Sequence, residues 1–183
     1  MNTDVIMAGF GGQGILMIGN LLSLAAMDEG RNVTYFPAYG VEMRGGTANC
    51  TVVISDEEIG SPVVGTPKSC VIMNGPSLEK YLPHVQKGGD LIINRSLVDP
   101  EKVTRKDLNL LSIPANDIAR EKVGSQQLAS MVALGAYVAV TGVVRMQTLV
   151  DCLPKVVSKK YERFIPLNVN ALKEGESFAR IHP

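Results

Sequence analysis

The sequence contains no tryptophan, only 5% aromatic residues and no excess of charge, since 18 lysines and arginines balance 18 acidic residues. A balanced surface lacks the basic patch that binds nucleic acid and the cationic face that binds anionic membranes. We therefore expect the partners to be small molecules or proteins rather than nucleic acid or membranes. Hydrophobic residues make up 45% of the chain, which suffices for one core, so residues 1–183 are expected to form a single domain.

Reactive side chains are also scarce. The cysteines Cys50, Cys70 and Cys152 lie far apart and form no C-x-x-C pair, which indicates reduced thiols in a cytoplasmic protein. Three thiols cannot complete a four-thiolate iron–sulfur site, and His84 and His182 have no metal-ligand spacing. No Ser/His/Asp or Cys/His arrangement can be chosen from spacing. We therefore name no catalytic residue and no metal ligand.

Long hydrophobic runs and targeting signals are absent as well. The chain passes from Met1 directly into a strand pattern, without the basic and apolar regions of a signal peptide. The most apolar stretch, residues 128–144, is interrupted by Ser130, two glycines and Thr141. It is too short for a comfortable bilayer span, so we expect a buried helix and no membrane insertion.

Strand and helix patterns alternate along much of the chain, which is typical of parallel βαβ units. We expect an α/β fold: a doubly wound, mostly parallel, Rossmann-like sheet with a helical C-terminal part. Residues 47–59 predict a β-hairpin insertion in that sheet. Strands are expected at residues 4–9, 32–36, 47–55, 69–74, 90–94 and 109–113, and helices at 12–29, from Pro76, and at 125–141, 147–158 and 168–179.

A glycine-rich segment, GFGGQG at residues 9–14, lies between the first predicted strand and the first predicted helix. It matches the G-x-G-x-x-G pattern of dinucleotide-binding turns. Glycines allow a ligand to approach the backbone closely, and the free N–H groups at the start of a helix favour a phosphate. The same glycines also suit a turn that only packs strand against helix, so both interpretations stay open. The candidate binding residues on this turn are Gly9, Gly11, Gly12, Gln13 and Gly14.

A nicotinamide site would also need an acidic residue at the end of the second strand, to hold the ribose hydroxyls. That segment reads YFPA at residues 35–38, with Asp28 and Glu29 before it and Glu42 after it. A stand-alone nucleotide-binding oxidoreductase therefore stays open as one alternative, although the acidic residue that it requires is missing at the end of this strand. A pure assembly module without any ligand is the other alternative.

A second loop, residues 39–46, follows the second predicted strand. In a doubly wound fold it lies at the same edge of the sheet as the glycine turn, where ligand crevices form. Its glycines allow positive φ, and its charged pair either braces the loop or reaches a partner or phosphate. An exposed pair adds little stability, which favours an interface or ligand role. The candidate residues here are Tyr39, Glu42, Arg44, Gly45 and Gly46.

Taken together, GFGGQG at residues 9–14, YGVEMRGGTA at 39–48 and IGSP at 59–62 resemble, in order and spacing, the gamma subunits of 2-oxoacid:ferredoxin oxidoreductases. The resemblance covers essentially the whole chain, because that family also has a late helical segment like LASMVALGA at residues 128–136. One departure is Val41, where proline is common in the family.

The resemblance implies a role in oxidative decarboxylation of a 2-oxoacid to an acyl-CoA. It also implies partners: alpha and beta subunits, a delta ferredoxin-like subunit as a further candidate, and ferredoxin or another electron acceptor. Thiamine diphosphate and iron–sulfur clusters belong to those partner subunits, and this chain alone is expected to bind no cofactor. Our hypothesis is that the glycine turn and the 39–46 loop shape the coenzyme A site of the complex.

The segment MRGGTANC at residues 43–50 is most similar to gamma subunits of the 2-oxoglutarate enzymes. The 2-oxoisovalerate and pyruvate enzymes come next. The isolated chain is expected to be inactive.

Overall fold

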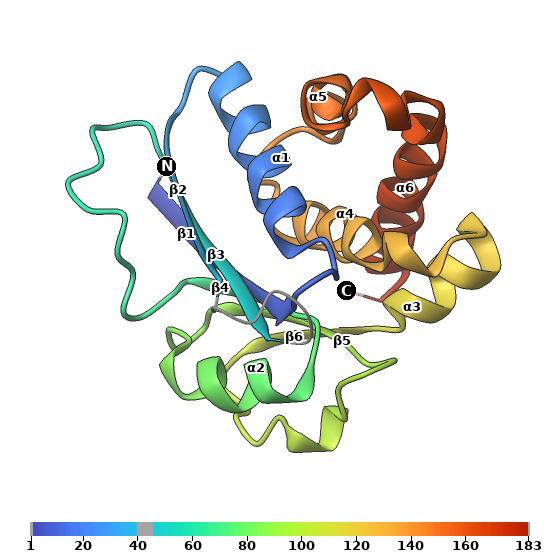
Figure 1. Ribbon diagram of the computed structural model, residues 1–183. Coiled ribbons are helices and arrows are strands. Elements are labelled where there is room, and N and C mark those ends of the chain that lie inside the picture. The colour runs from blue at the N-terminus through green and yellow to red at the C-terminus, as the bar shows by residue number, and fades with distance from the viewer. Residues whose placement is uncertain (1, 40–45, 183) are drawn as a thin grey trace.

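The computed structural model describes residues 2–39 and 46–182, which form a six-stranded sheet covered by helices on both faces (Figure 1). The order of the strands in the sheet is β2-β3-β1-β4-β5-β6. The expected α/β class is therefore confirmed. The strands are β1 (Asn2–Phe10), β2 (Asn32–Tyr39), β3 (Thr47–Ser55), β4 (Ser69–Ile72), β5 (Asp90–Asn94) and β6 (Asn109–Ile113).

One strand runs against the others. Strands β1, β4, β5 and β6 pair in parallel, whereas β3 lies between β1 and β2 and is antiparallel to both. The expected antiparallel insertion is therefore present: residues 47–55 form β3, and β2 and β3 together make the hairpin. Strand β2 is also longer than the predicted residues 32–36 and includes Pro37. An edge strand tolerates proline because the missing N–H interrupts no inner ladder.

The helices largely follow the sequence pattern. Helix α2 begins where Pro76 predicts, and the Asn74 side chain caps it by accepting a hydrogen bond from the Ser77 N–H at 2.8 Å. The predicted helix at residues 125–141 is a 3₁₀ turn, η4 (Gln126–Leu128), followed by α4, and the helical segment at residues 115–123 was not expected. The α-helices are α1 (Ile15–Asp28), α2 (Gly75–Tyr81), α3 (Ala115–Ile118), α4 (Ala129–Thr141), α5 (Met146–Val156) and α6 (Ile165–Ile181). The other helical turns are η1 (Leu82–His84), η2 (Pro100–Lys102), η3 (Ala119–Val123) and η5 (Lys159–Phe164).

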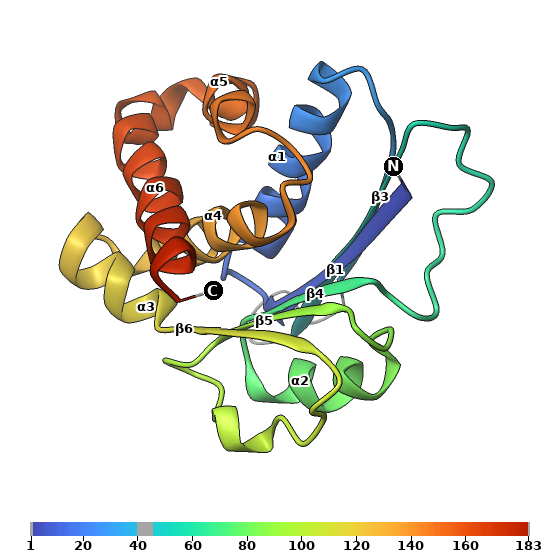
Figure 2. The same ribbon diagram turned by 180° about the vertical axis from the view of Figure 1, so that it is seen from behind.

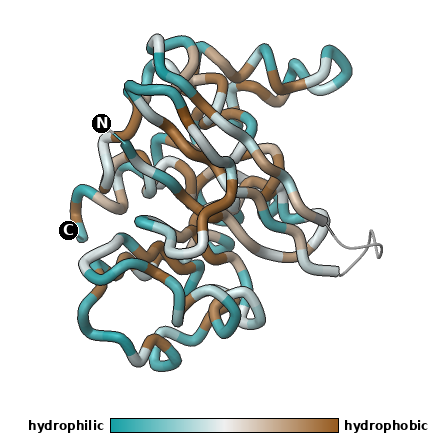
Figure 3. The backbone as a smooth tube through the Cα atoms, turned by 90° about the vertical axis from the view of Figure 1, so that its left-hand side faces the viewer, coloured by the Kyte–Doolittle hydropathy of each residue, from teal (hydrophilic) through white to brown (hydrophobic). Residues whose placement is uncertain are grey.

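The sheet separates two hydrophobic cores. Helices α1, α4, α5 and α6 cover one face, and α2 covers part of the other (Figures 1 and 2). Strand β1 serves both cores, because Val5 and Met7 point to the first and Ile6 and Ala8 to the second. Burial on both faces explains why β1 is a continuous apolar run rather than an alternating one. Figure 3 shows this concentration of hydrophobic residues along the central strands.

The apolar segment at residues 128–144 behaves as its sequence predicts. It forms α4, whose residues from Ala129 to Val138 are all buried, including the large side chain of Tyr137. None of the helices in the two described ranges has the length and apolar character that a membrane span requires.

Candidate functional site

The glycine turn connects β1 to α1. Gly12 and Gly14 have φ angles of 91° and 79°, which disfavour side chains with a Cβ atom. Gly14 is the N-cap of α1 and provides no side-chain cap, so the start of this helix keeps N–H groups that a ligand can use. A Cβ at Gly14 would also lie 2.6 Å from Oγ of Ser130 in α4. The turn therefore packs closely against α4 and also leaves backbone N–H groups that suit an anion.

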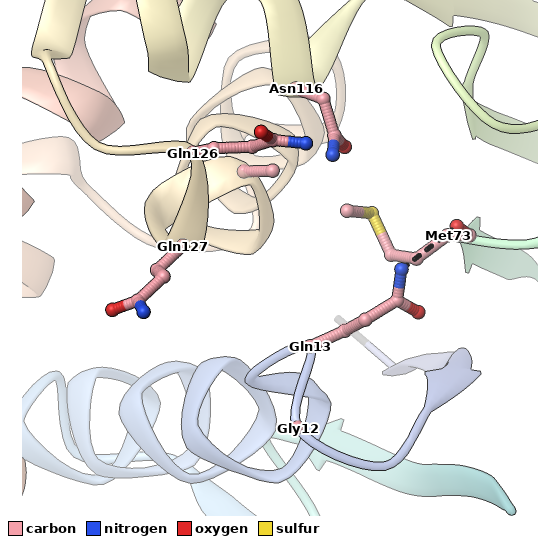
Figure 4. A pocket seen from close by; sticks show the side chains of 7 residues that line it. Gly12, Gln13, Met73, Asn116, Gln126 and Gln127 are labelled. Atoms are coloured by element: carbon pink, nitrogen blue, oxygen red, sulfur yellow. Dashed lines mark hydrogen bonds between the residues drawn. The ribbon is translucent and has the colours of Figure 1, made fainter. Parts of the chain in front are cut away.

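Gln13 holds the turn against the neighbouring strand. Its Oε1 atom accepts a hydrogen bond from the Phe10 N–H at 2.6 Å, and its Nε2 group donates one to the Met73 carbonyl at 3.4 Å (Figure 4). A Cβ at Gly9 would lie 2.5 Å from Gln13 Oε1, so Gly9 leaves the space that this brace needs. Both ends of the Gln13 amide are thus engaged with backbone, and its role is to shape the site.

The second predicted loop returns to the glycine turn. The Gly11 N–H donates a hydrogen bond to the Gly46 carbonyl at 2.8 Å, which places Gly46 directly beside the turn. Tyr39 ends β2, where its backbone pairs with Ala48. The other candidates of this loop, Glu42, Arg44 and Gly45, lie outside the described residues.

A pocket of about 420 Å³ opens at this edge of the sheet (Figure 4). Helix α1 follows β1 on one face of the sheet, whereas α2 follows the adjacent strand β4 on the opposite face. Such a reversal at the carboxyl ends of parallel strands is where α/β proteins bind ligands. The pocket is lined by Gly12, Gln13, Met73, Asn116, Gln126, Gln127 and Ala129.

Only two of those lining residues, Gly12 and Gln13, were candidates from the sequence. Met73 and Asn116 follow β4 and β6 at the same carboxyl edge. Because ligands bind at the carboxyl ends of parallel strands, this rule could have selected both residues from the sequence. Gln126 and Gln127 could not be found in this way, because their η4 turn lies far along the chain from any strand end.

Asn116 is oriented by a buried neighbour. Asn94, which ends β5 and is fully buried, accepts hydrogen bonds through Oδ1 from the backbone N–H groups of Ala115 and Ser96, at 3.1 and 3.3 Å. Its Nδ2 group therefore faces Asn116 and donates to the Asn116 Oδ1 atom at 2.7 Å. Asn116 is left with its own amide N–H groups for the pocket.

The cysteines offer no nucleophile at neutral pH. All three are free and buried, as expected. Burial raises the pKa of the Cys50 and Cys70 thiols to about 12. Burial and the neighbouring Asp28 carboxylate raise the pKa of Cys152 to about 11. Within residues 2–39 and 46–182, no group of His, Cys, Asp and Glu side chains is placed to hold a metal ion.

The strand order also bears on the nicotinamide alternative. In a dinucleotide-binding fold the second strand lies next to the first, so its terminal acid reaches the ribose of a nucleotide held on the glycine turn. Here β3 separates β2 from β1. The end of β2 is therefore one strand farther from the turn, which disfavours a dinucleotide site.

These features define an α/β protein with a pocket at the carboxyl edge of its parallel strands and no catalytic group that we can name among its described residues. The chain belongs to the pyruvate ferredoxin/flavodoxin oxidoreductase family, whose model matches residues 4–178. The expectation drawn from the three motifs is thereby confirmed at the level of the family.

Individual relatives agree with this assignment. The chain is 39% identical over 178 residues to the ketoisovalerate oxidoreductase subunit VorA of Methanothermobacter marburgensis, covering 96% of this chain but only 36% of that protein. It is 35% identical to the 2-oxoglutarate synthase subunit KorC of the same organism, covering 96% of this chain and 95% of KorC. The gamma subunit of a keto/oxoacid ferredoxin oxidoreductase from Geobacter sulfurreducens superposes with a TM-score of 0.84 at 28% identity, covering 98% of this chain and 99% of that one.

Proposed function

We propose that this chain is the gamma subunit of a cytoplasmic, multi-subunit 2-oxoacid:ferredoxin oxidoreductase that acts on 2-oxoglutarate. The assembled enzyme converts the 2-oxoacid and coenzyme A to an acyl-CoA and CO₂, and an electron pair passes to ferredoxin or another acceptor. Thiamine diphosphate and iron–sulfur clusters lie on the alpha, beta and delta ferredoxin-like subunits. The choice of 2-oxoglutarate is supported by KorC, a relative that matches this chain over 95% of its own length.

The observation on which the proposal depends is the hydrogen bond from the Gly11 N–H to the Gly46 carbonyl. It joins the end of the 39–46 loop to the glycine turn, at the edge of the sheet where the pocket opens. The end of the second segment therefore meets the first at the edge of the sheet where the sequence predicted a ligand site. A subunit in whose described residues we name no catalytic group can contribute there by binding and positioning a substrate whose chemistry occurs on a partner.

Coenzyme A is the substrate that this edge suits best. It carries phosphates, and the start of α1 offers backbone N–H groups and the positive end of a helix dipole. Within the 39–46 loop, we propose that Arg44 approaches the same phosphates, with Glu42, Gly45 and Tyr39 shaping the loop around the ligand. The gamma subunit then completes the coenzyme A site while the thiamine-bound acyl group is formed on other chains.

Co-expression with the alpha and beta subunits of the same cell tests the proposal. We expect a stable complex whose kcat/KM is highest for 2-oxoglutarate when 2-oxoglutarate, 2-oxoisovalerate and pyruvate are compared with coenzyme A and an electron acceptor. Failure of the chain to co-purify with such subunits would contradict the assignment as a gamma subunit. A preference for another 2-oxoacid would contradict only the substrate.

2-Oxoisovalerate is the second candidate substrate. The VorA relative is the more similar of the two methanogen proteins in sequence, at 39% identity. However, this chain spans about a third of that relative's length, so the match does not cover the rest of the VorA polypeptide. The same assay with three 2-oxoacids decides between the candidates.

A further inference from the structure

The IGSP segment at residues 59–62 lies at the edge of the sheet opposite to the glycine turn. It belongs to residues 56–68, which connect β3 to β4 and contain no helix or strand. Strand β3 ends at Ser55, which pairs with Asn2 at the start of β1. The connection therefore leaves the sheet where the parallel strands begin, and IGSP does not line the pocket where they end.

This connection forms an arm, residues 59–66, that stands clear of the other elements (Figures 1 and 2). Its only hydrogen bond with the described residues is internal, from the Val63 N–H to Ser61 Oγ at 3.1 Å. The arm reads IGSPVVGT, without a charged residue, and Val63 is 74% exposed. Connections in compact domains usually have about 4–6 residues, and longer ones without secondary structure are often functional. The arm is therefore free to bind another molecule.

One face of the β2–β3 hairpin is uncovered on the same side of the sheet as the arm (Figure 1). Phe36 of β2 and Ile6 of β1 both pair with Thr51 of β3, so these three side chains lie on one face. Ile6 is buried there in the second hydrophobic core, to which no described residue of β2 or β3 belongs. Helix α2 packs on β1 and β4 instead, which leaves Phe36 51% exposed.

The uncovered face also lacks the charges that usually keep such a surface in water. Neither β2 nor β3 contains a charged residue, and β2 is an edge strand. Exposed faces of antiparallel sheets are usually polar, and edge strands usually carry charges that prevent pairing with other proteins. A continuous apolar surface without charge is typical of a protein interface. We call the arm and this face together the hairpin surface.

The relatives indicate what covers the hairpin surface. The match to VorA spans 36% of that polypeptide, so about two thirds of VorA lies outside it and is covalently joined to the matching domain. The match to KorC instead spans 95% of KorC. A separate chain of this kind lacks the covalent link and needs a non-covalent surface to stay bound to its neighbour. Apolar surfaces provide such contacts, since their burial favours association.

We propose that the hairpin surface binds the partner subunit that corresponds to the rest of the VorA polypeptide, through an apolar and uncharged patch of that subunit. Val63 of the arm and Phe36 of the sheet face are the central contacts. This inference rests on the proposed function and adds the surface by which the chain joins the complex. The pocket lies at the other edge of the sheet and stays accessible to a ligand.

Two lysine variants test the hairpin surface. Val63→Lys and Phe36→Lys each place a charge on one half of it, and both side chains are exposed, so the fold should tolerate them. Val140→Lys, at an exposed valine of α4 on the opposite side of the sheet, is the matched control. Calorimetry measures the affinity of the full chain for the purified partner subunit. We expect about tenfold weaker binding for Val63→Lys and Phe36→Lys, and a change within about twofold for Val140→Lys.

Hydrogen exchange of the wild-type chain provides a second readout. Most N–H groups of the arm lack a partner and should exchange freely in the isolated chain, whereas the bound subunit should slow them about tenfold. Unchanged affinity in both variants, or unchanged exchange of the arm, overturns the inference. A dimer of the isolated chain that Val63→Lys dissociates, measured by ultracentrifugation, would make a second copy the occupant and also overturn it. A wild-type chain that does not bind the partner subunit contradicts the proposed function instead.

Discussion

Carboxamide side chains occupy the carboxyl end of each of the four parallel strands. Gln13 follows β1, Asn74 follows β4, Asn94 ends β5 and Asn116 follows β6. The side-chain oxygens of Gln13, Asn74 and Asn94 accept hydrogen bonds from backbone N–H groups. These bonds fix the loops at this edge without adding charge. The fourth, Asn116, turns a donor toward the pocket. These four side chains therefore shape the edge beside the start of helix α1 without contributing charge of their own.

Gly12 allows a direct test of the phosphate role at the scale of one residue. Its φ of 91° strains any substituted side chain, but a Cβ at this position meets no atom of the described residues within 4 Å. Asp and Asn are close in size and both tolerate positive φ better than most residues, so Gly12→Asn is a matched control for Gly12→Asp. If the turn binds phosphate, we expect Gly12→Asp to weaken coenzyme A binding by the assembled enzyme about tenfold relative to Gly12→Asn.

The comparison of these two variants also decides between a ligand site and a packing turn. A turn that serves only strand-to-helix packing predicts equal coenzyme A affinity for Gly12→Asp and Gly12→Asn, as measured by calorimetry. An assembly module without a ligand predicts that both variants change complex formation while substrate kinetics stay constant. The charge-dependent loss that we expect fits neither alternative.

At the scale of elements, local patterns predicted most strands and helices but not their neighbours in space. Proline located the start of α2, since it acts on the backbone locally. Helix α1 begins at Ile15, three residues after the predicted start at residue 12, because Gly12 and Gly14 have positive φ. The insertion of β3 between β1 and β2 was missed because strand order depends on tertiary pairing. The irregular α3 and η3 segment was missed because short turns carry little periodicity. Gln126 was expected in the first turn of a longer helix at residues 125–141 and lies instead in the 3₁₀ turn η4.

Helices α4 and α6 approach each other closely at two glycines, Gly135 and Gly175. A Cβ at Gly175 would lie 1.9 Å from the Val132 carbonyl oxygen, and one at Gly135 would lie 2.0 Å from the Leu172 carbonyl oxygen. We expect Gly175→Ala to lower the free energy of unfolding by about 3 kcal/mol, because the helices must separate despite the better helix propensity of alanine. Urea denaturation followed by circular dichroism measures this. Gly60→Ala, in an open loop with no atom within 4 Å, should change stability little; equal stability of both variants would show that α6 can move away without cost.

At the scale of the whole molecule, the described residues provide a shaped pocket and no catalytic group that we can name. Its buried thiols stay protonated at neutral pH, and the described residues form no metal cluster. The described part of the crevice is lined by amides, glycines and apolar groups, which bind and orient but neither accept electrons nor attack a carbon. We therefore expect the chemistry to take place on other chains, as the proposed role of a gamma subunit requires.

The purified chain should therefore be catalytically silent and should not bind redox nucleotides. Because β3 separates β2 from β1, the last residues of β2 lie one strand farther from the glycine turn than in a dinucleotide-binding fold. Titration of the isolated chain with NAD, NADP and flavins, followed by fluorescence or calorimetry, should give no saturable binding in the micromolar range. Release of CO₂ from 2-oxoglutarate should appear only after the alpha and beta subunits are added. Saturable NAD binding, or decarboxylation by the homogeneous chain, would favour a stand-alone oxidoreductase instead.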